Sequence, residues 1–388
     1  MASRAAALAS GFAVMFIAYA IRYDYGALLP SMVVDLSLTE LKLGGAIFTS
    51  YFIAYMVFSP IMGGLTDRFT AKPIVVMGCA LMGLGSLMLS FSKSLLEACM
   101  WYGLAGVGAA GTWTPVSAAT QRWFSRERRG LALGFMIVGI CTGFGVTSLV
   151  TPYILDAYSW RTCWLILGVI SLLVALIVLL AFQENPNIYL SGKGHVKKLY
   201  LDVDAWLVGV SYMLVGFAIL VPFTYLPMYS IKEVGAGSWI SIWLISLIAV
   251  GGVAGALTLP ALSDRVSDRR RVIVLSNGLV VVSSLIALLK TVEAVMASAV
   301  IFGLAYGAIW PLYGSCASEY FGEENAGKVV GFWTLFLGIG SIASPIASGA
   351  LADATGTIAS PLALASMVAA LSLLPLTAIK RVKALKST

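Results

Sequence analysis

The sequence predicts an all-α membrane protein in which twelve transmembrane helices form two six-helix, pseudo-symmetric bundles. Three observations lead to this prediction. Hydrophobic residues make up 60% of the 388 residues and charged residues only 11%, whereas a soluble domain carries about 25% charged residues. Apolar stretches long enough to cross a bilayer recur along the whole chain. The second half also repeats features of the first half at a constant offset of 197 residues.

The apolar stretches predict helices rather than the strands of a membrane barrel. A spanning helix needs about 20 apolar residues, whereas barrel strands are about 10 residues long and alternate in polarity. No such alternation occurs, and the predicted helices lie at 8–32, 43–64, 73–91, 95–118, 130–153, 161–182, 205–229, 238–262, 272–289, 294–316, 327–350 and 359–379. We therefore expect an N-terminal bundle at 1–182, a cytoplasmic linker at 183–204 and a C-terminal bundle at 205–388.

The repeat between the halves falls on glycine, aromatic and charged residues. Asp67-Arg68 recurs as Asp264-Arg265. The same offset relates Pro30 to Pro227, Gly106 to Gly303, Trp113 to Trp310 and Gly143 to Gly340. Two like halves in a very hydrophobic chain are typical of membrane transporters, whose substrate sites lie near the middle of the bilayer.

The basic residues predict the orientation of the chain in the membrane. If both termini are cytoplasmic, 19 of the 25 lysine and arginine residues fall in segments on the cytoplasmic side, as the positive-inside rule requires. This distribution also accounts for the net charge of +7, so a nucleic-acid partner is not expected. The short loops and tails fit a multi-pass protein of a prokaryotic plasma membrane, and we expect a monomer in contact with the lipid bilayer.

Two loops carry a charged motif. Residues 63–72 (GGLTDRFTAK) follow the second predicted helix, and residues 260–270 (PALSDRVSDRR) follow the eighth. An aspartate at the end of one helix is favoured beside the N terminus of a neighbouring helix or beside a basic side chain. Such a bond can hold one side of a transporter closed. We expect a cytoplasmic gate made of Gly64, Asp67, Arg68, Asp264 and Arg265.

Both loops resemble the loop signature of the major facilitator superfamily. The resemblance covers the twelve predicted spans, the two halves, both motifs and the central linker. It implies the major facilitator fold and a rocker-switch mechanism of alternating access, in which a central site opens to each side of the membrane in turn.

A finer resemblance rests on residues 122–134 (RWFSRERRGLALG) and on Ser159-Trp160-Arg161. These segments are similar to the oxalate/formate antiporter and monocarboxylate transporter branch, which implies an anionic substrate. Members of that branch usually carry a basic residue midway along the eighth or eleventh helix. Segments 239–262 and 327–350 have none at mid-depth, so the dianion oxalate is a poor fit.

The first predicted helix contains two charged residues, Arg22 and Asp24. A charge in the bilayer core costs about 2.5–3.5 kcal/mol on insertion scales, so it usually faces a cavity and has a function. The residues 197 positions later are Ile219 and Val221, so the helix does not need these charges as scaffold. We expect Arg22 to bind a carboxylate and Asp24 to carry a proton. The alternative is that both are structural polar anchors near the outer interface.

Aromatic residues complete the predicted substrate site. The candidates are Tyr19, Tyr23, Tyr51, Tyr55, Trp113, Tyr225, Trp243, Tyr306, Trp310 and Trp333. Each of them could instead serve in helix packing or as an interface anchor. One intramembrane arginine among aromatic and small residues suits a small, partly apolar monoanion better than a sugar, which is usually bound by several Asn and Gln side chains.

The sequence therefore predicts a secondary active transporter of a small organic anion similar to a monocarboxylate, coupled to protons. The alternative is proton-coupled efflux of hydrophobic or cationic compounds with Asp24 as the acidic site. No nucleotide-binding motif, nucleophile-base pair or metal cluster is present in the sequence, so we expect neither an ATP-driven pump nor an enzyme, and no cofactor.

Overall fold

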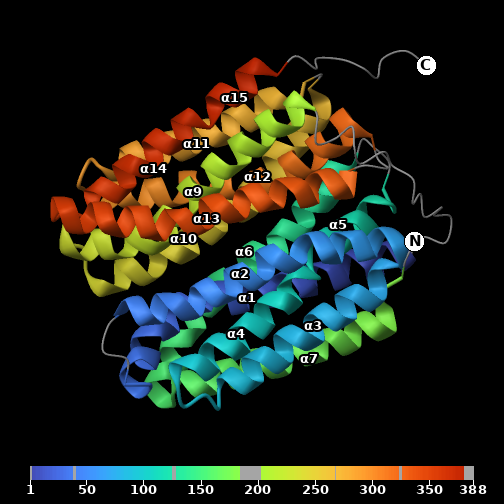
Figure 1. The fold of residues 1–388 in the computed structure, drawn as a ribbon. Helices are drawn as coiled ribbons and strands as arrows, with labels where there is room; N and C mark the ends of the chain where they lie inside the picture. The colour runs from blue at the N-terminus through green and yellow to red at the C-terminus, as the bar shows by residue number, and fades with distance from the viewer. Residues whose placement is uncertain are drawn as a thin grey trace. The chain divides into compact units, whose positions relative to one another are not determined.

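The computed structural model describes residues 2–37, 41–124, 128–183, 202–266, 268–322 and 326–379, and every regular element in these ranges is a helix. The first half contains α1 (Ala2–Asp35), α2 (Leu41–Arg68), α3 (Ala71–Leu89), α4 (Leu95–Ala110), α5 (Trp113–Gln121), α6 (Arg129–Ala157) and α7 (Trp160–Ala181) (Figure 1). The second half contains α9 (Val203–Lys232), α10 (Ser238–Arg265), α11 (Arg270–Ala287), α12 (Val292–Phe321), α13 (Ala326–Thr355), α14 (Ala359–Leu371) and α15 (Leu373–Ala378).

Eleven stretches of the described chain are helical, long and apolar enough to cross a membrane. The fourth predicted span, 95–118, differs because it is divided into α4 and α5. Pro115 has no N–H to bond the carbonyl of Gly111. Just before the break, the chain tightens: the amides of Gly111 and Thr112 donate to the carbonyls three residues earlier, those of Gly108 at 3.0 Å and Ala109 at 3.1 Å. Together α4 and α5 account for the remaining predicted span.

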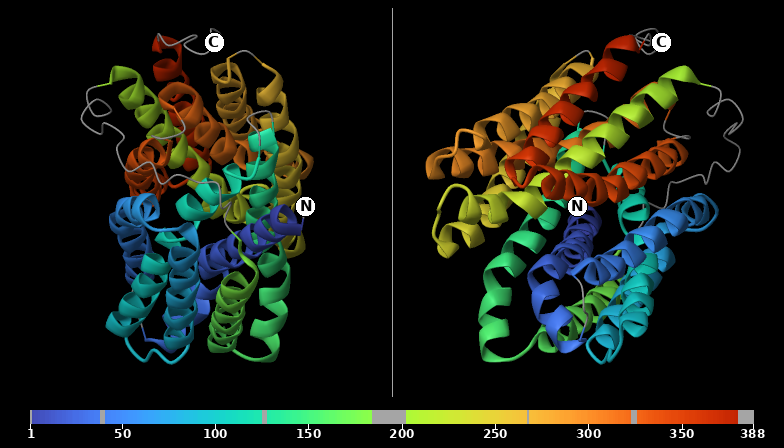
Figure 2. Two further views of the ribbon diagram at one scale, coloured as in Figure 1. Left: turned by 90° about the vertical axis from the view of Figure 1, so that its right-hand side faces the viewer. Right: turned by 60° about the vertical axis from the view of Figure 1, so that its left-hand side comes forward.

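Contacts divide the chain into two compact units. Unit 1 contains residues 1–126 and 138–192, and unit 2 contains residues 127–137 and 193–388. In unit 1, α3 lies beside α4 and α7 (Figure 2), and in unit 2, α12 lies beside α10 and α11. Most of the predicted linker, 183–204, lies outside the described residues, so the proposed bundle boundaries stay predictions. The start of α6 belongs to unit 2 because Gly130 and Gly134 allow close contact with α10.

The 197-residue repeat is present in the contacts between helices. Gly143 of α6 packs against the backbone of Phe16 in α1, and Gly340 of α13 packs in the same way against Met213 in α9. Both positions of the first pair differ by 197 from those of the second. A Cβ atom at either glycine would collide with a carbonyl oxygen. The two units therefore share the close packing of the fifth predicted helix on the first.

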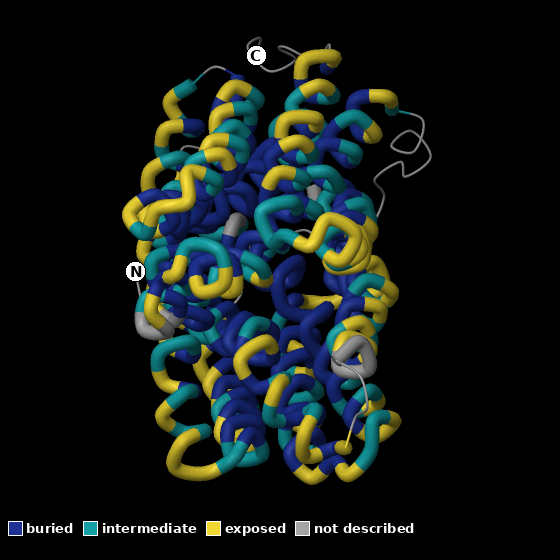
Figure 3. The backbone as a smooth tube through the Cα atoms, turned by 90° about the vertical axis from the view of Figure 1, so that its left-hand side faces the viewer, coloured by how far each residue is buried: buried dark blue, intermediate teal, exposed yellow. Residues whose placement is uncertain are grey.

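The burial pattern within each unit is that of a membrane bundle. Buried residues face the inside of the units, while exposed residues lie along the outer sides of helices (Figure 3). Many exposed side chains are large and apolar, including Leu173, Leu176 and Leu180 of α7. Soluble proteins rarely expose continuous apolar surfaces of this kind. The outward surface of such helices is suited to lipid.

Replacement of Gly340 by alanine tests the close packing of α13 on α9. The added methyl group would meet the carbonyl oxygen of Met213, and overpacking of this kind costs about 1–3 kcal/mol. We expect a lower melting temperature of the purified protein. Gly331→Ala on the same helix is the matched control, because the new Cβ would have no described atom within 4 Å apart from its chain neighbours and the backbone of its own helix. Equal melting temperatures for the two variants would contradict this packing.

Candidate functional site

Arg22 lies inside unit 1 and is surrounded by aromatic rings. Its side chain is on α1, and the residue is only 6% exposed. The guanidinium carbon lies 4.6 Å from the ring centroid of Tyr19 and 4.5 Å from that of Tyr55. The rings of Tyr51 and Phe52 are each at 5.4 Å. We call these four residues the aromatic cage; their ring faces attract a cation through the ring quadrupole.

Helical spacing explains how the aromatic cage forms. Tyr19 precedes Arg22 by three residues on α1, which places both on one face of the helix. Tyr51 and Tyr55 are four residues apart and share a face of α2. Two helix faces therefore supply three of the four rings of the cage.

The guanidinium of Arg22 is buried without an acidic partner. Its Nε donates a hydrogen bond to the Tyr51 hydroxyl at 3.3 Å, and within the described residues no carboxylate pairs with it. Arginine has five N–H donors, and among the described residues only Nε makes a hydrogen bond. Burying a charge without a counter-ion is costly. Whether Arg22 binds an anion or is a structural polar anchor near the outer interface stays a prediction.

Tyr102 of α4 contacts the backbone of Arg22, a contact that was not predicted from the sequence. Its hydroxyl lies 3.2 Å from the carbonyl oxygen of Ile21 and 3.3 Å from that of Arg22, to which it can donate. Its ring stacks on Tyr51 with centroids 4.8 Å apart. Tyr102 therefore contacts both the backbone of Arg22 and the ring that Arg22 binds. Its counterpart in the second half is Ala299, so comparison of the repeats could have identified it.

Asp24 is separate from Arg22, as the spacing of two residues on a helix predicts. The carboxyl group is 3% exposed and accepts a hydrogen bond from Thr151 of α6, with Oγ1 to Oδ1 at 2.6 Å. A hydroxyl can donate to an ionised carboxylate and accept from a protonated one. Asp24 can therefore keep this partner in both protonation states.

The corresponding part of unit 2 has neither charge nor cage. The positions that match Tyr19, Tyr51, Phe52 and Tyr55 hold Gly216, Ile248, Ala249 and Gly252. Ser348 corresponds to Thr151; its buried hydroxyl has no hydrogen-bond partner in the described part of the chain, and Val221 stands where unit 1 has Asp24. The charged groups are therefore additions to one copy of a shared scaffold.

The other aromatic candidates in unit 1 lie near the cage or along its helices. Tyr23 is half-buried, and its ring packs against Tyr19 at 6.0 Å and Phe144 at 5.4 Å. Trp113 is buried at the start of α5. Among the described residues, the rings that lie over the Arg22 guanidinium are those of the aromatic cage, and these do not include Tyr23 or Trp113. Their role in binding stays a prediction.

The aromatic candidates in unit 2 have different surroundings. Tyr306 and Trp310 are buried and pack edge to face with centroids 6.1 Å apart. The indole of Trp333 donates to the carbonyl of Ala205 at 2.8 Å, so it joins α13 to α9. Tyr225 is half-buried. Trp243 is 52% exposed, which is also the behaviour of a lipid-facing anchor.

The first copy of the charged motif is only partly described. Gly64 is exposed in α2, and Asp67 and Arg68 form the end of that helix. The side chains of Asp67 and Arg68 lie outside the described residues, so this part of the gate stays a prediction.

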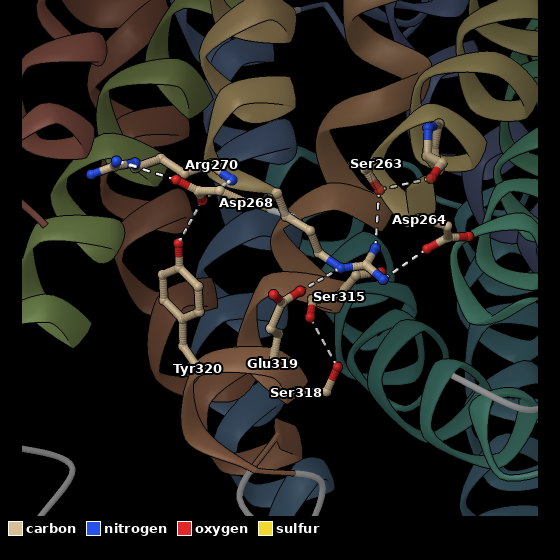
Figure 4. Close-up of polar contacts among 10 residues, drawn as sticks. Ser263, Asp264, Asp268, Arg270, Ser315, Ser318, Glu319 and Tyr320 are labelled. Carbon is tan, nitrogen blue, oxygen red and sulfur yellow. Dashed lines mark hydrogen bonds and ion pairs between the residues drawn. The ribbon is translucent and has the colours of Figure 1, made fainter. Parts of the chain in front are cut away.

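The second copy of the motif shows the neighbours of Asp264, while its role in a gate stays a prediction. Its carboxylate lies 2.8 Å from Nη2 of Arg269 (Figure 4). It also lies against Gly130 in the first turn of α6, where an added Cβ would be 2.7 Å from Oδ2. Both partners are of the predicted kind, a basic side chain and a helix N terminus. The basic side chain is Arg269, whereas Arg265 is exposed.

Arg269 is the centre of a buried ionic cluster that was not predicted from the sequence. Its Nε binds Glu319 of α12 at 2.6 Å, and its Nη1 donates to the Ser263 hydroxyl at 3.0 Å (Figure 4). Asp268 beside it accepts from Tyr320 at 3.2 Å and pairs with Arg270 at 3.2 Å. The cluster joins the end of α10 and the start of α11 to α12. Arg269 thus connects the carboxylate of Asp264 to Glu319 of α12.

Comparison with known proteins identifies relatives that match more than three-quarters of the chain. A family model described as Major Facilitator Superfamily matches residues 8–268 and 241–387. Monocarboxylate transporter 11 from Mus musculus is 29% identical over 322 residues, which cover 77% of this chain and 70% of that protein. A probable sulfoacetate transporter, SauU, from Cupriavidus necator is 24% identical over 375 residues, or 88% of this chain and 86% of that protein.

Solved structures show the same fold. The human organic anion transporter MFSD10 (TETRAN) aligns with a TM-score of 0.76 at 12% identity, covering 96% of this chain and 98% of the other. The E. coli fucose:proton symporter FucP aligns with a TM-score of 0.72 at 15% identity, covering 97% and 98%. The predicted fold class and the resemblance to the major facilitator superfamily are confirmed, and the finer resemblance is supported for its monocarboxylate transporter part. The matched proteins are transporters, which confirms that the chain is not an enzyme.

Removal of Arg269 tests the ionic cluster. Arg269→Met would leave the carboxylates of Asp264 and Glu319 without their shared cation, and breaking a buried pair in this way costs about 3–5 kcal/mol. We expect a marked fall in the melting temperature of the detergent-purified protein. Arg265→Met removes a nearby exposed arginine and should leave the melting temperature nearly unchanged. Equal effects of the two substitutions would contradict a central role for Arg269.

Proposed function

Because the chain belongs to the major facilitator superfamily, a family of membrane transporters, we propose that it is a secondary active transporter of a small organic anion, similar to a monocarboxylate and coupled to protons. The observation that carries this proposal is the buried guanidinium of Arg22, which has ring faces around it and no acidic partner among the described residues. An anionic substrate would supply the missing counter-charge.

The geometry around Arg22 favours a single carboxylate. The ring of Tyr19 faces the guanidinium at 4.6 Å and that of Tyr55 at 4.5 Å, and Nε is used by Tyr51. The terminal nitrogens remain, and a guanidinium can bind one carboxylate through two parallel hydrogen bonds. The surrounding rings suit a short apolar or planar substituent. A sugar would need more polar partners than this cage offers.

The relatives support an anion as the substrate. One is a monocarboxylate transporter and another a probable sulfoacetate transporter, and the matched segments cover more than three-quarters of this chain in both cases. Carboxylate and sulfonate groups both bear a negative charge that a guanidinium can bind. Sulfoacetate carries both groups and is a dianion, so these relatives support a negatively charged substrate and not the number of its charges.

Asp24 is the proposed site of proton coupling. It lies on the same helix as Arg22 but bonds Thr151 rather than the guanidinium. A proton and an anion could thus occupy neighbouring places on α1 without direct competition. The two units would present these places to each side of the membrane by alternating access, with the charged motifs as the cytoplasmic gate. Cytoplasmic termini, a prokaryotic plasma membrane and a monomer are parts of this proposal.

Substitution of Arg22 tests anion binding. Arg22→Gln should abolish the stabilisation of the purified protein by millimolar pyruvate or benzoate, because ligand stabilisation grows as RT ln(1 + [L]/Kd). Uptake of the same acids into proteoliposomes should fall at least about tenfold, as expected for loss of a charge-assisted bidentate contact worth about 1.5–3 kcal/mol. Thermal-shift and uptake assays measure the two effects.

Lys93→Gln is the matched control, since Lys93 is an exposed cation of the same unit. It should leave both acid binding and uptake unchanged. Undiminished acid binding in Arg22→Gln would remove Arg22 from the site. In that case Arg22→Gln would be expressed in a pump-deficient strain and its drug resistance measured. Increased resistance would favour efflux through Asp24 instead.

Substitution of Asp24 tests proton coupling. Asp24→Asn keeps the shape of the side chain and its hydrogen bond with Thr151 but removes the titrating group. We expect acid accumulation driven by an imposed pH gradient to be lost, while exchange of labelled for unlabelled acid continues at a comparable rate. Retained accumulation in this variant would exclude Asp24 as the proton carrier. Arg22→Gln should differ by losing both activities.

A further inference from the structure

In each unit, a carboxylate at the end of the first helix binds the start of the last span. The first helix of unit 1, α1, ends at Asp35, and that of unit 2, α9, is followed directly by Glu233. The partners of Asp35 are at the start of α7, and those of Glu233 are at the start of α14. In each unit, the contact lies at the end of the bundle where the first helix has its C terminus.

The contact in unit 1 is an ion pair with aromatic support. Oδ2 of Asp35 accepts from Nη2 of Arg161 at 2.7 Å and from the indole of Trp160 at 3.1 Å. Nη1 of Arg161 donates to the carbonyls of Ser90 and Ser92 at 2.9 and 2.8 Å. The guanidinium also lies 4.3 Å from the Trp160 ring. Arg161 therefore joins α1, α7 and the end of α3.

The contact in unit 2 uses a helix N terminus in place of a cation. Oε1 of Glu233 accepts from the Thr357 hydroxyl at 2.7 Å and from the backbone amides of Ile358 and Ala359. Burial by itself would raise the pKa of Glu233. These hydrogen bonds, together with the positive charge of Lys290, lower the pKa below its usual value. The carboxylate that makes this contact therefore stays ionised at neutral pH.

The two contacts occupy matching places in the repeat. Trp160 and Arg161 correspond to Thr357 and Ile358 at the 197-residue offset. The counterpart of Asp35 is Lys232, so the carboxylate of Glu233 lies one residue out of register. The connection is thus shared by both units, while the side chains that make it differ. The anion site shows the opposite pattern, because Arg22 and its cage occur in one unit only. What both units share is the attachment of the first helix, not a ligand.

We propose that these two contacts, the distal clasps, fix the first helix of each unit to its last span, so that each unit reorients as one body and turnover depends on both clasps. This inference rests on the proposed transport function. Asp35 and Glu233 act as positioning residues, since neither one is part of the Arg22 site. Loosening a clasp should slow reorientation without changing the contacts that bind the anion.

Isosteric substitutions separate turnover from affinity. Asp35→Asn and Glu233→Gln should each lower kcat for pyruvate uptake into proteoliposomes about fivefold, because each removes an ion pair or a helix cap that is partly exposed to solvent. KM should change less than about twofold. Asp35→Glu keeps the charge and should restore most of the rate. A rise in KM that accounts for the loss, or an unchanged kcat, would overturn the proposal.

Matched controls are available at the same ends of the units. Asp156 and Glu293 are exposed acidic residues near the end of α6 and the start of α12. Asp156→Asn and Glu293→Gln should leave kcat and KM unchanged. Equal losses in these variants would show that acidic charge at this end matters rather than the clasps.

Hydrogen exchange in lipid nanodiscs distinguishes failure of the clasps from failure of the proposed function. Asp35→Asn should speed amide exchange in segments 28–35 and 160–166, and Glu233→Gln in 226–232 and 357–364, with neither control doing so. Unchanged exchange overturns the clasps whatever the substrate. Lack of pyruvate uptake by the unaltered protein, with these exchange changes present, counts against the transport proposal and supports the clasps.

Discussion

The burial of one positive charge in the first helix is the constraint on which the candidate site depends. A guanidinium in the bilayer core is costly, and the structure offsets this cost with ring faces rather than with a carboxylate. Tyr19 and Tyr55 approach Arg22 most closely, and Tyr51 accepts its Nε hydrogen bond. Compensation by rings leaves the charge formally unneutralised. Anion binding at this position, as proposed above, would supply the counter-charge that no carboxylate of the described residues provides.

Comparison of the two units separates scaffold from site. Gly143 and Gly340 make the same close helix contact in the two units, so this packing belongs to the repeated scaffold. The positions of the aromatic cage, in contrast, hold small or aliphatic residues in unit 2, including Gly216 and Gly252. Unit 2 thus has smaller or aliphatic side chains at the positions where unit 1 has the rings around Arg22. The two units therefore share the framework and differ at the candidate site.

Much of the fold and part of the site could be predicted from local sequence. Apolar length predicts the spans, and the absence of a counterpart marked Arg22 and Asp24 as specific. The division between α4 and α5 was missed, because length alone does not register that Pro115 leaves the Gly111 carbonyl without its usual donor. Tyr102 was missed because its hydroxyl bonds a backbone carbonyl some 80 residues away. Nothing in the local pattern specifies that distance.

The sequence by itself determined that the chain spans the membrane as a duplicated bundle and that a charge must be accommodated in its first helix. These properties follow from hydropathy and from the energetic cost of a charge in lipid, which depend on composition and position along a helix. Only the tertiary structure decided the partners: rings for Arg22, Thr151 for Asp24, and Arg269 rather than Arg265 for Asp264. The rotation and close approach of neighbouring helices select these pairs, and both depend on packing throughout each unit.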